Sequence, residues 1–437
     1  MNTNLQNTKS RSLRYRILLT VSLLTIVRIG SFIPVPYIER ETFATLLQNE
    51  SSSTNAVAQV LTTFSGGGNT SFGLLSLGIL PYINASIIIQ LLTTAIPSLS
   101  KMQKEEGEYG RRKLTDYVRF LTFFWAIVES ISVTYSLRGL IFDWSFWTAT
   151  QISVTLITGS MIVLWFSELI TRDGLGNGSS LLICFNIVSS LPDQIKLFIF
   201  SLKDQTNGFM SSFFLISIFL ITTLGCIYMN EAIIKIPLVS ARQLLRKQAT
   251  LTTKGFANST LPLRINQAGV MPLVFTSYAM VVFSSLIGVI KSKVNIFNFL
   301  IQFPFFNESL FYWSGKLLFW SIYAALIFFF TYFYSTIVLD PKDVAERFRK
   351  NSVVILGIEP GNPTKSYLTR TLRRIASINA IFLICNIVGL QIIESLLNLN
   401  VTSLRGLGFT SQLILVNVLI DTVKRIRSFL NEEENTL

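Results

Sequence analysis

The chain has 437 residues, of which half are hydrophobic and only 14% are charged. Soluble domains carry roughly 25% charged residues, so the composition excludes an ordinary soluble protein and indicates a polytopic membrane protein. The chain contains no histidine, and its three cysteines lie far apart without a disulfide framework or zinc-type spacing. We therefore expect no metal, no other cofactor and no histidine-based catalysis.

Hydropathy predicts ten membrane spans, because a bilayer core needs about 20 apolar residues. We expect them near Ile17–Pro34, Leu74–Ile96, Val118–Leu137, Thr148–Ile170, Leu181–Phe200, Phe209–Met229, Gln267–Ile290, Trp313–Val338, Arg374–Leu397 and Leu407–Val423. The first is interpreted as a permanent span, since no signal-peptidase-like site follows it. The fifth and tenth contain polar residues, which favours positions screened from lipid by neighbouring helices.

The basic residues indicate the orientation of the chain. With a cytoplasmic N-terminus, 28 of the 37 Lys and Arg residues lie on the cytoplasmic side and 8 on the other side. The positive-inside rule then places both termini on the cytoplasmic or stromal side.

Two basic loops on that side, Asn230–Asn266 and Leu339–Arg373, are unusually long. Topology alone accounts for any single Lys or Arg in them. Together, however, the loops indicate docking to an acidic surface, such as ribosomal RNA or an acidic motor protein.

The segment Phe64–Leu92 is the most informative part of the chain. A Gly-rich, uncharged stretch runs into an apolar span with Pro81 near its start and with Ile79 and Ile83 one helical turn apart. We expect the helix to bend at Pro81, because proline removes a backbone donor and clashes with the preceding turn. The pattern favours a re-entrant element followed by a helix that lines a pathway.

Ionisable residues in or near the spans keep a second function open. They are Arg28, Glu129, Glu168, Glu394 and Asp421. Charges inside a membrane are functional by default, so an ion-coupled secondary transporter is the alternative hypothesis. A membrane hydrolase is disfavoured, because the chain has neither histidine nor a clustered acid pair.

Six further blocks, in chain order, resemble the SecY family of protein-conducting channels, as does the segment Phe64–Leu92. The blocks are Val27–Ile38, Lys104–Phe120, Ile170–Ile183, Leu261–Phe275, Phe328–Thr364 and Gly408–Ile426. The resemblance implies an all-α polytopic fold of ten helices in two five-helix halves, 1–200 and 201–437, around a central pore. It also implies that the protein is not an enzyme: it would pass unfolded polypeptides across the membrane and release signal and transmembrane segments laterally into lipid.

The resemblance also assigns roles to particular residues. The family's aliphatic pore ring falls on Ile79, Ile83, Ile183, Val274 and Ile414. Its plug falls on 64–72, including Phe64, Ser65, Gly66, Gly67, Gly68 and Phe72, and its lateral-gate positions fall on Asn84 and Asn266. The residues expected to dock the motor or the ribosome are Arg242, Arg246, Lys247, Lys254, Arg347, Arg349, Lys350 and Glu359. Glu359 stands where bacterial members have Arg.

The partners that the family implies are a SecE-type small membrane subunit, with a SecG-type subunit as a further candidate, and a SecA-type motor ATPase. They also include the ribosome, signal peptides, unfolded preproteins and membrane lipid. The many Asn, Ile and Phe residues, the short C-terminus and the lack of a targeting peptide favour a plastid-encoded protein of the thylakoid membrane. A bacterial plasma-membrane protein is the alternative.

Overall fold

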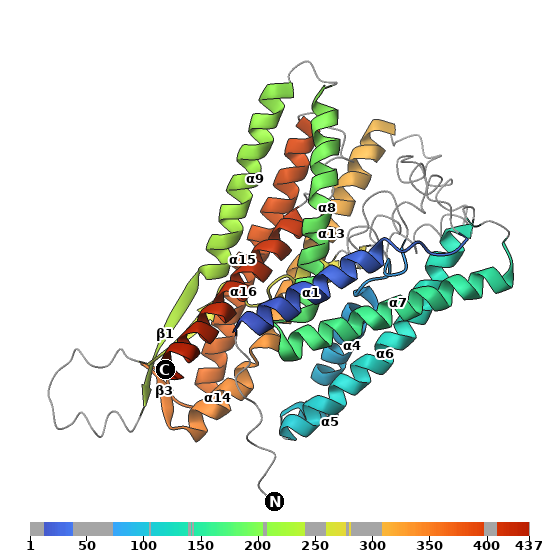
Figure 1. Ribbon diagram of the computed structural model, residues 1–437. Coiled ribbons are helices and arrows are strands. Elements are labelled where there is room, and N and C mark those ends of the chain that lie inside the picture. Colours follow the sequence, from blue (N-terminus) through green and yellow to red (C-terminus); the bar gives the residue numbers. More distant parts are fainter. Residues whose placement is uncertain are drawn as a thin grey trace, which may run out of the picture. The chain divides into compact units, whose positions relative to one another are not determined.

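The computed structural model describes residues 13–37, 73–104, 106–138, 141, 144–203, 208–240, 259–276, 279–280, 308–396 and 409–436 (Figure 1). The chain divides into two compact units, Met1–Gln205 with Val401–Leu437 and Thr206–Asn400. The closing helix α16 (Phe409–Thr436) packs against α8 (Gly178–Lys203) and α1 (Leu13–Ser31), and so belongs to the first unit. The division of the sequence into halves at residue 200 stays a prediction.

The first unit is helical. Besides α1, α8 and α16 it contains α4 (Leu80–Ala95), α5 (Pro97–Lys104), α6 (Gly107–Ser136) and α7 (Phe146–Asp173). Neighbours along the series α4, α6, α7, α8 and α16 pack against one another. The start of α7 is fixed by a capping box, in which the Ser145 backbone N–H donates to the Thr148 hydroxyl over 2.9 Å.

The prediction that the helix bends at Pro81 is wrong. Pro81 occupies the first turn of α4, where its missing N–H has no helical partner to lose and its fixed φ suits the helix. The bend lies instead at Ile96, where α4 and α5 meet at 107°. Pro97 begins α5, and the residue before a proline is disfavoured in helical geometry.

Among the described residues, four helices are long and apolar enough to cross a membrane, or five if the bent pair α4–α5 counts as one span. The four are Gly107–Tyr135, Phe146–Asp173, Trp320–Lys350 and Asn362–Gly389. Half of the seventh expected span, Gln267–Ile290, lies outside the described residues, so the count of ten spans stays a prediction. The helix α8 runs through Pro192 without ending there.

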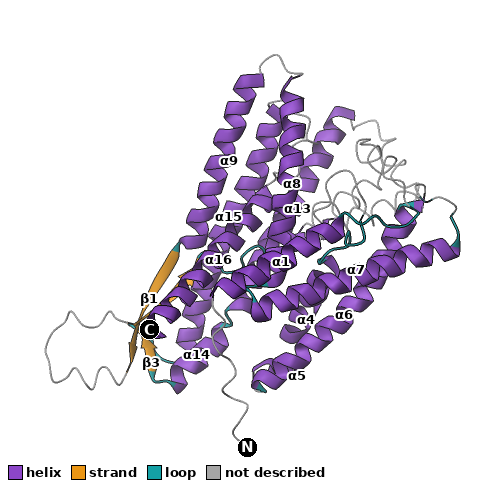
Figure 2. Cartoon of the chain, in the orientation of Figure 1, coloured by secondary structure: helices purple, strands orange, loops and turns teal. Residues whose placement is uncertain are grey.

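The second unit combines long helices with a small antiparallel sheet (Figure 2). Its elements are α9 (Gly208–Glu231), β1 (Ile233–Ser240), β2 (Ser259–Arg264), α13 (Glu308–Val338), α14 (Pro341–Lys350), β3 (Val353–Ile355) and α15 (Asn362–Leu396). The sheet has the order β2-β1-β3, with Ile236 opposite Leu261 and Val239 opposite Val354. The two long basic loops expected from the sequence are therefore joined through β1.

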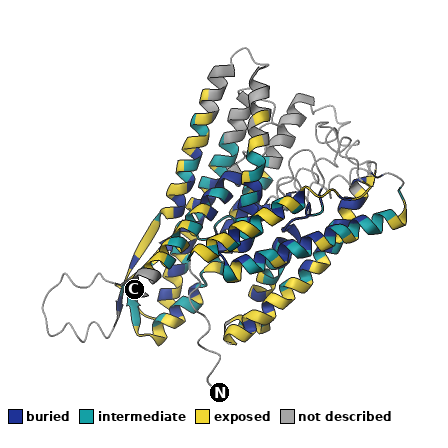
Figure 3. Cartoon of the chain, viewed as in Figure 1, coloured by how far each residue is buried: buried dark blue, intermediate teal, exposed yellow. Residues whose placement is uncertain are grey.

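The sheet is held by an apolar core of its own. Ile236, Leu263 and Ile355 from the three strands are buried together with Leu368 and Ile375 of α15. The strand β1 is exposed from Ile233 to Lys235 and has buried residues further along, at Ile236 and Val239 (Figure 3). Backbone donors of the loops are used inside this sheet rather than left to solvent.

Candidate functional site

The residues 73–79, directly after the expected plug, form an anchored, irregular segment in the first unit. The Gly73 N–H donates to the Ser76 hydroxyl over 2.7 Å, and the Leu74 N–H donates to the Ile33 carbonyl over 2.8 Å. Leu77 and Ile79 are almost fully buried. The segment therefore enters α4 from a fixed position beside the end of α1.

Glycines allow the backbones to come this close. A Cβ at Gly159 of α7 would lie 2.2 Å from the Leu74 carbonyl oxygen, and one at Gly73 would lie 2.0 Å from the Ser31 carbonyl oxygen. Neither position admits a larger residue unless the backbone moves. Gly159 and Gly73 thus fix the segment between α7 and α1.

The residues of the expected pore ring are all buried. Ile79 immediately precedes α4 and Ile83 lies in its first turn, and the Ile83 N–H donates to the Ile79 carbonyl over 3.1 Å, so the two side chains share one helical face. Ile183 lies on α8 and Ile414 on α16, two helices that pack together. Val274 lies in the helical residues 271–276 of the second unit.

Several expected site residues lie outside the described residues. They are all of the plug, Phe64, Ser65, Gly66, Gly67, Gly68 and Phe72, and the docking residues Arg242, Arg246, Lys247 and Lys254. Their roles stay predictions.

Asn84, the first expected gate residue, is hydrogen-bonded to a carboxyl group. Its side-chain amide on α4 donates to Glu129 Oε1 on α6 over 2.5 Å, and both residues are half-buried. No nearby residue in the sequence predicts this partner for Glu129, because 45 positions separate the two. The bond ties α4 to α6 inside the first unit.

Asn266, the second expected gate residue, is the middle of a chain of three buried asparagines. Its amide donates to Asn230 Oδ1 of α9 over 2.6 Å, and its own Oδ1 accepts from Asn379 Nδ2 of α15 over 3.1 Å. Sequence reasoning missed Asn230 and Asn379, since only an asparagine inside each apolar helix marks them. All three lie in the second unit.

The described part of the expected docking surface is exposed and basic. Arg347, Arg349 and Lys350 occupy the last turn of α14, where cations favour the negative end of the helix dipole. Asp340 caps the other end by accepting from the Lys342 N–H over 3.0 Å. Glu359 is exposed in the turn that follows β3.

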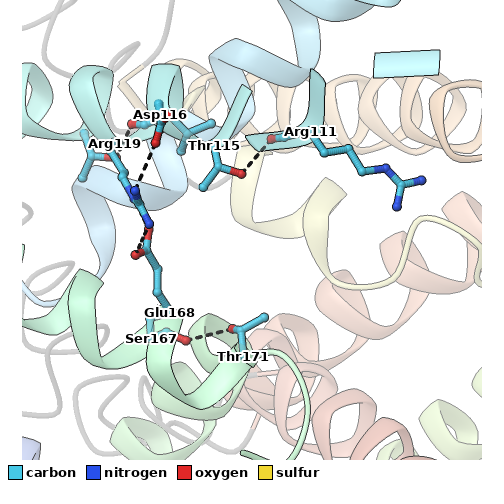
Figure 4. Close-up of polar contacts among 9 residues, drawn as sticks. Arg111, Thr115, Asp116, Arg119, Ser167, Glu168 and Thr171 are labelled. Atoms are coloured by element: carbon cyan, nitrogen blue, oxygen red, sulfur yellow. Dashed lines mark hydrogen bonds and ion pairs between the residues drawn. The ribbon is translucent and has the colours of Figure 1, made fainter. Parts of the chain in front are cut away.

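Glu168, one of the charges that favoured a transporter, is paired at the end of α7. Arg119 of α6 holds both of its carboxylate oxygens at 2.7 Å and also reaches Asp116 over 3.0 Å (Figure 4). The described residues contain no group of three Cys, Asp or Glu side chains suited to a metal ion. The ion pair therefore ties α6 to α7, with both carboxylate oxygens of Glu168 bound to Arg119.

The SecY family model matches residues 73–423. A protein translocase subunit SecY from Vaucheria litorea is 74% identical and covers all of both chains, and one from Synechocystis is 39% identical over 98% of this chain and 94% of the relative. A solved structure described as showing how the plug domain of SecY stabilises the closed channel has a TM-score of 0.59 at 16% identity, covering 98% of this chain and 95% of that one. Sec61 in the canine ribosome-channel complex has a TM-score of 0.58 at 14% identity, with the same coverage.

Proposed function

This chain belongs to the SecY family, and we propose that it forms the central protein-conducting channel of a Sec translocase. It would pass unfolded polypeptides across the membrane and release signal and transmembrane segments sideways into lipid. The observation that supports this proposal best is the anchored segment 73–79, which brings buried Ile79 and Ile83 onto one face at the start of α4.

The ring of Ile79, Ile83, Ile183, Val274 and Ile414 would be the seal of the channel. Branched apolar side chains dewet a narrow opening and so block ions at rest. They form no directional bonds with a passing chain, so a polypeptide can push them aside. The plug, 64–72, would add a second, removable block on one side of the ring.

The two expected gate residues would stabilise the closed state in different ways. Asn84 is bonded to Glu129 within the first unit, and Asn266 to Asn230 and Asn379 within the second. Each bond fixes its own helix, so a signal segment would have to part helices that are internally braced.

Docking would use the basic cytoplasmic face. The exposed cations of α14 suit an acidic motor or ribosomal RNA phosphates, and the canine Sec61 relative is described in a ribosome complex. The other partners would be SecE-type and SecG-type subunits, a SecA-type ATPase, signal peptides and preproteins. The acidic Glu359 at the turn would repel an acidic partner surface locally.

We place the protein in the thylakoid membrane of a plastid, with both termini in the stroma. The distribution of Lys and Arg supports this orientation, and the relatives from an alga and a cyanobacterium support the plastid. Labelling single cysteines from one side of sealed vesicles tests the orientation.

Substituting two residues of the ring tests whether the ring seals the channel. Replacing Ile79 and Ile83 together by Ser should raise the passive efflux of small ions from proteoliposomes, because a polar rim no longer dewets. The matched control is Val128→Ser with Ile131→Ser on α6, two exposed aliphatic positions. Equal efflux from both double variants and wild type would show that Ile79 and Ile83 do not form the seal.

A further inference from the structure

The three asparagines of the second unit form an incomplete hydrogen-bond chain. Asn230, Asn266 and Asn379 are 9%, 7% and 2% exposed. Two bonds link them, while Asn230 Nδ2 and Asn379 Oδ1 are buried without a partner among the described residues. An unpaired polar group in a buried network is costly, so a rearrangement that brings either end of this chain a partner is favoured.

This asparagine chain lies at the base of the β1–β2 hairpin. Asn230 is in the last turn of α9, which leads into β1, and Asn266 follows β2 after a single residue. The Ile265 N–H donates to the Ala232 carbonyl over 3.0 Å, so the hairpin pairing continues to the residue next to Asn266. A displacement of the hairpin therefore acts directly on the Asn266 bonds.

The residues after Asn266 are packed against α13. Gln267 Oε1 accepts from the Ser335 hydroxyl over 3.3 Å, and the Phe275 ring lies 4.9 Å from that of Tyr334 and 5.4 Å from that of Phe330. Val274, the ring residue of this unit, lies between these two attachments. The segment 266–276 thus connects the hairpin to a ring position through eight residues.

The hairpin is in turn fixed to the docking residues. The strand β3 pairs with β1 just after α14, and the Leu356 N–H donates to the Pro237 carbonyl over 3.4 Å. Ile355 packs in the shared core with Leu368. Buried packing and strand pairing therefore connect α14 with β1 and β2.

We propose that the Asn230–Asn266–Asn379 chain is a joint that couples docking at the cytoplasmic sheet to the position of Val274. In the undocked state Asn379 and Asn230 hold the start of the 266–276 segment. Docking shifts the hairpin, Asn266 changes its bonds, and the ring opens. The inference rests on the proposed channel function and gives positioning roles to Asn230 and Asn379, which the family resemblance did not single out.

The test uses Asn379→Leu in the full chain, purified with its small membrane subunit and reconstituted in vesicles, with ribosomes as the docking probe. Two quantities are measured: the affinity for ribosomes, and the ratio of ion efflux with and without bound ribosomes. We expect the affinity for ribosomes to stay within about twofold of wild type. The efflux ratio should fall about tenfold, because losing one buried hydrogen bond changes an equilibrium constant by about that factor. Asn379→Ala is the second variant if Asn379→Leu does not fold.

The matched control is Asn386→Leu, also on α15, whose amide donates to the Phe382 carbonyl of its own helix over 2.8 Å. It should keep the wild-type efflux ratio. A wild-type ratio in folded Asn379→Leu or Asn379→Ala, or an equal loss in Asn386→Leu, would overturn the inference and leave the proposed function standing. Failure of wild type to bind ribosomes would overturn the proposed ribosome docking and this inference with it.

Discussion

Gly159→Ala should destabilise the first unit, although alanine is the better helix former. The new Cβ would lie 2.2 Å from the Leu74 carbonyl oxygen and 3.3 Å from Leu75 Cδ2. Relaxed carbon–oxygen contacts are about 3.3 Å or longer, so either the segment 73–79 or the helix α7 must move away by about 1 Å. The segment is anchored by the Leu74 N–H bond to Ile33, which this movement would stretch.

The magnitude follows from three terms. Overpacking costs about 1–3 kcal/mol, and a weakened backbone hydrogen bond costs about 1 kcal/mol. The higher helix propensity of alanine stabilises the folded state by about 1 kcal/mol relative to glycine. The free energy of unfolding should therefore fall by about 1–3 kcal/mol.

The assay is denaturant unfolding of the purified protein in detergent, followed by tryptophan fluorescence. The control is Gly389→Ala on α15, where a Cβ meets no described atom within 4 Å and the propensity gain should stabilise by about 1 kcal/mol. If Gly159→Ala unfolds at the same denaturant concentration as wild type or at a higher one, α7 does not approach the segment 73–79 as closely as the structure shows.

Three further changes probe other parts of the structure. Ile355→Ala should lower the stability of the sheet by about 2–4 kcal/mol, because its 2% exposed side chain leaves a cavity, and hydrogen exchange in β1 should rise. Arg119→Ala should cost no more than about 1 kcal/mol in thermal unfolding, since Arg119 is half exposed in its pair with Glu168; a larger loss would mean that the pair is better shielded from solvent than the structure shows. Arg347→Glu with Arg349→Glu should weaken ribosome binding and flatten its dependence on salt, and unchanged binding at both low and high salt would exclude α14 as a docking surface.

The apolar helices were predictable because hydropathy marks them directly. The expected spans Thr148–Ile170 and Phe209–Met229 differ from α7 and α9 by only one to three residues at each end. Hydropathy does not mark helix ends in water, however. The helix α15 therefore begins at Asn362, twelve residues before the expected Arg374, and includes part of what was expected to be loop.

The sheet and the asparagine bonds were not predictable in the same way. The run Ile233–Ser240 has the alternation of a strand, but its partners Ser259–Arg264 and Val353–Ile355 lie far along the chain. Likewise, Asn266 matched a family motif, while the hydrogen bond from Asn379, 113 positions away, depends on tertiary packing. Local patterns specify elements, whereas the partners of buried polar groups follow only from the fold.

Photo-crosslinking can test whether this chain conducts polypeptides through the aliphatic ring. A photoreactive residue is placed at position 83 or 414, and a preprotein is stalled part-way through translocation in reconstituted vesicles. Conduction through the ring predicts crosslinks from both positions to the stalled preprotein, dependent on its signal sequence, and none from the exposed position 131 on α6. Crosslinking to position 131 as strong as to positions 83 and 414, or no crosslinks at 83 and 414 while translocation proceeds, would contradict it.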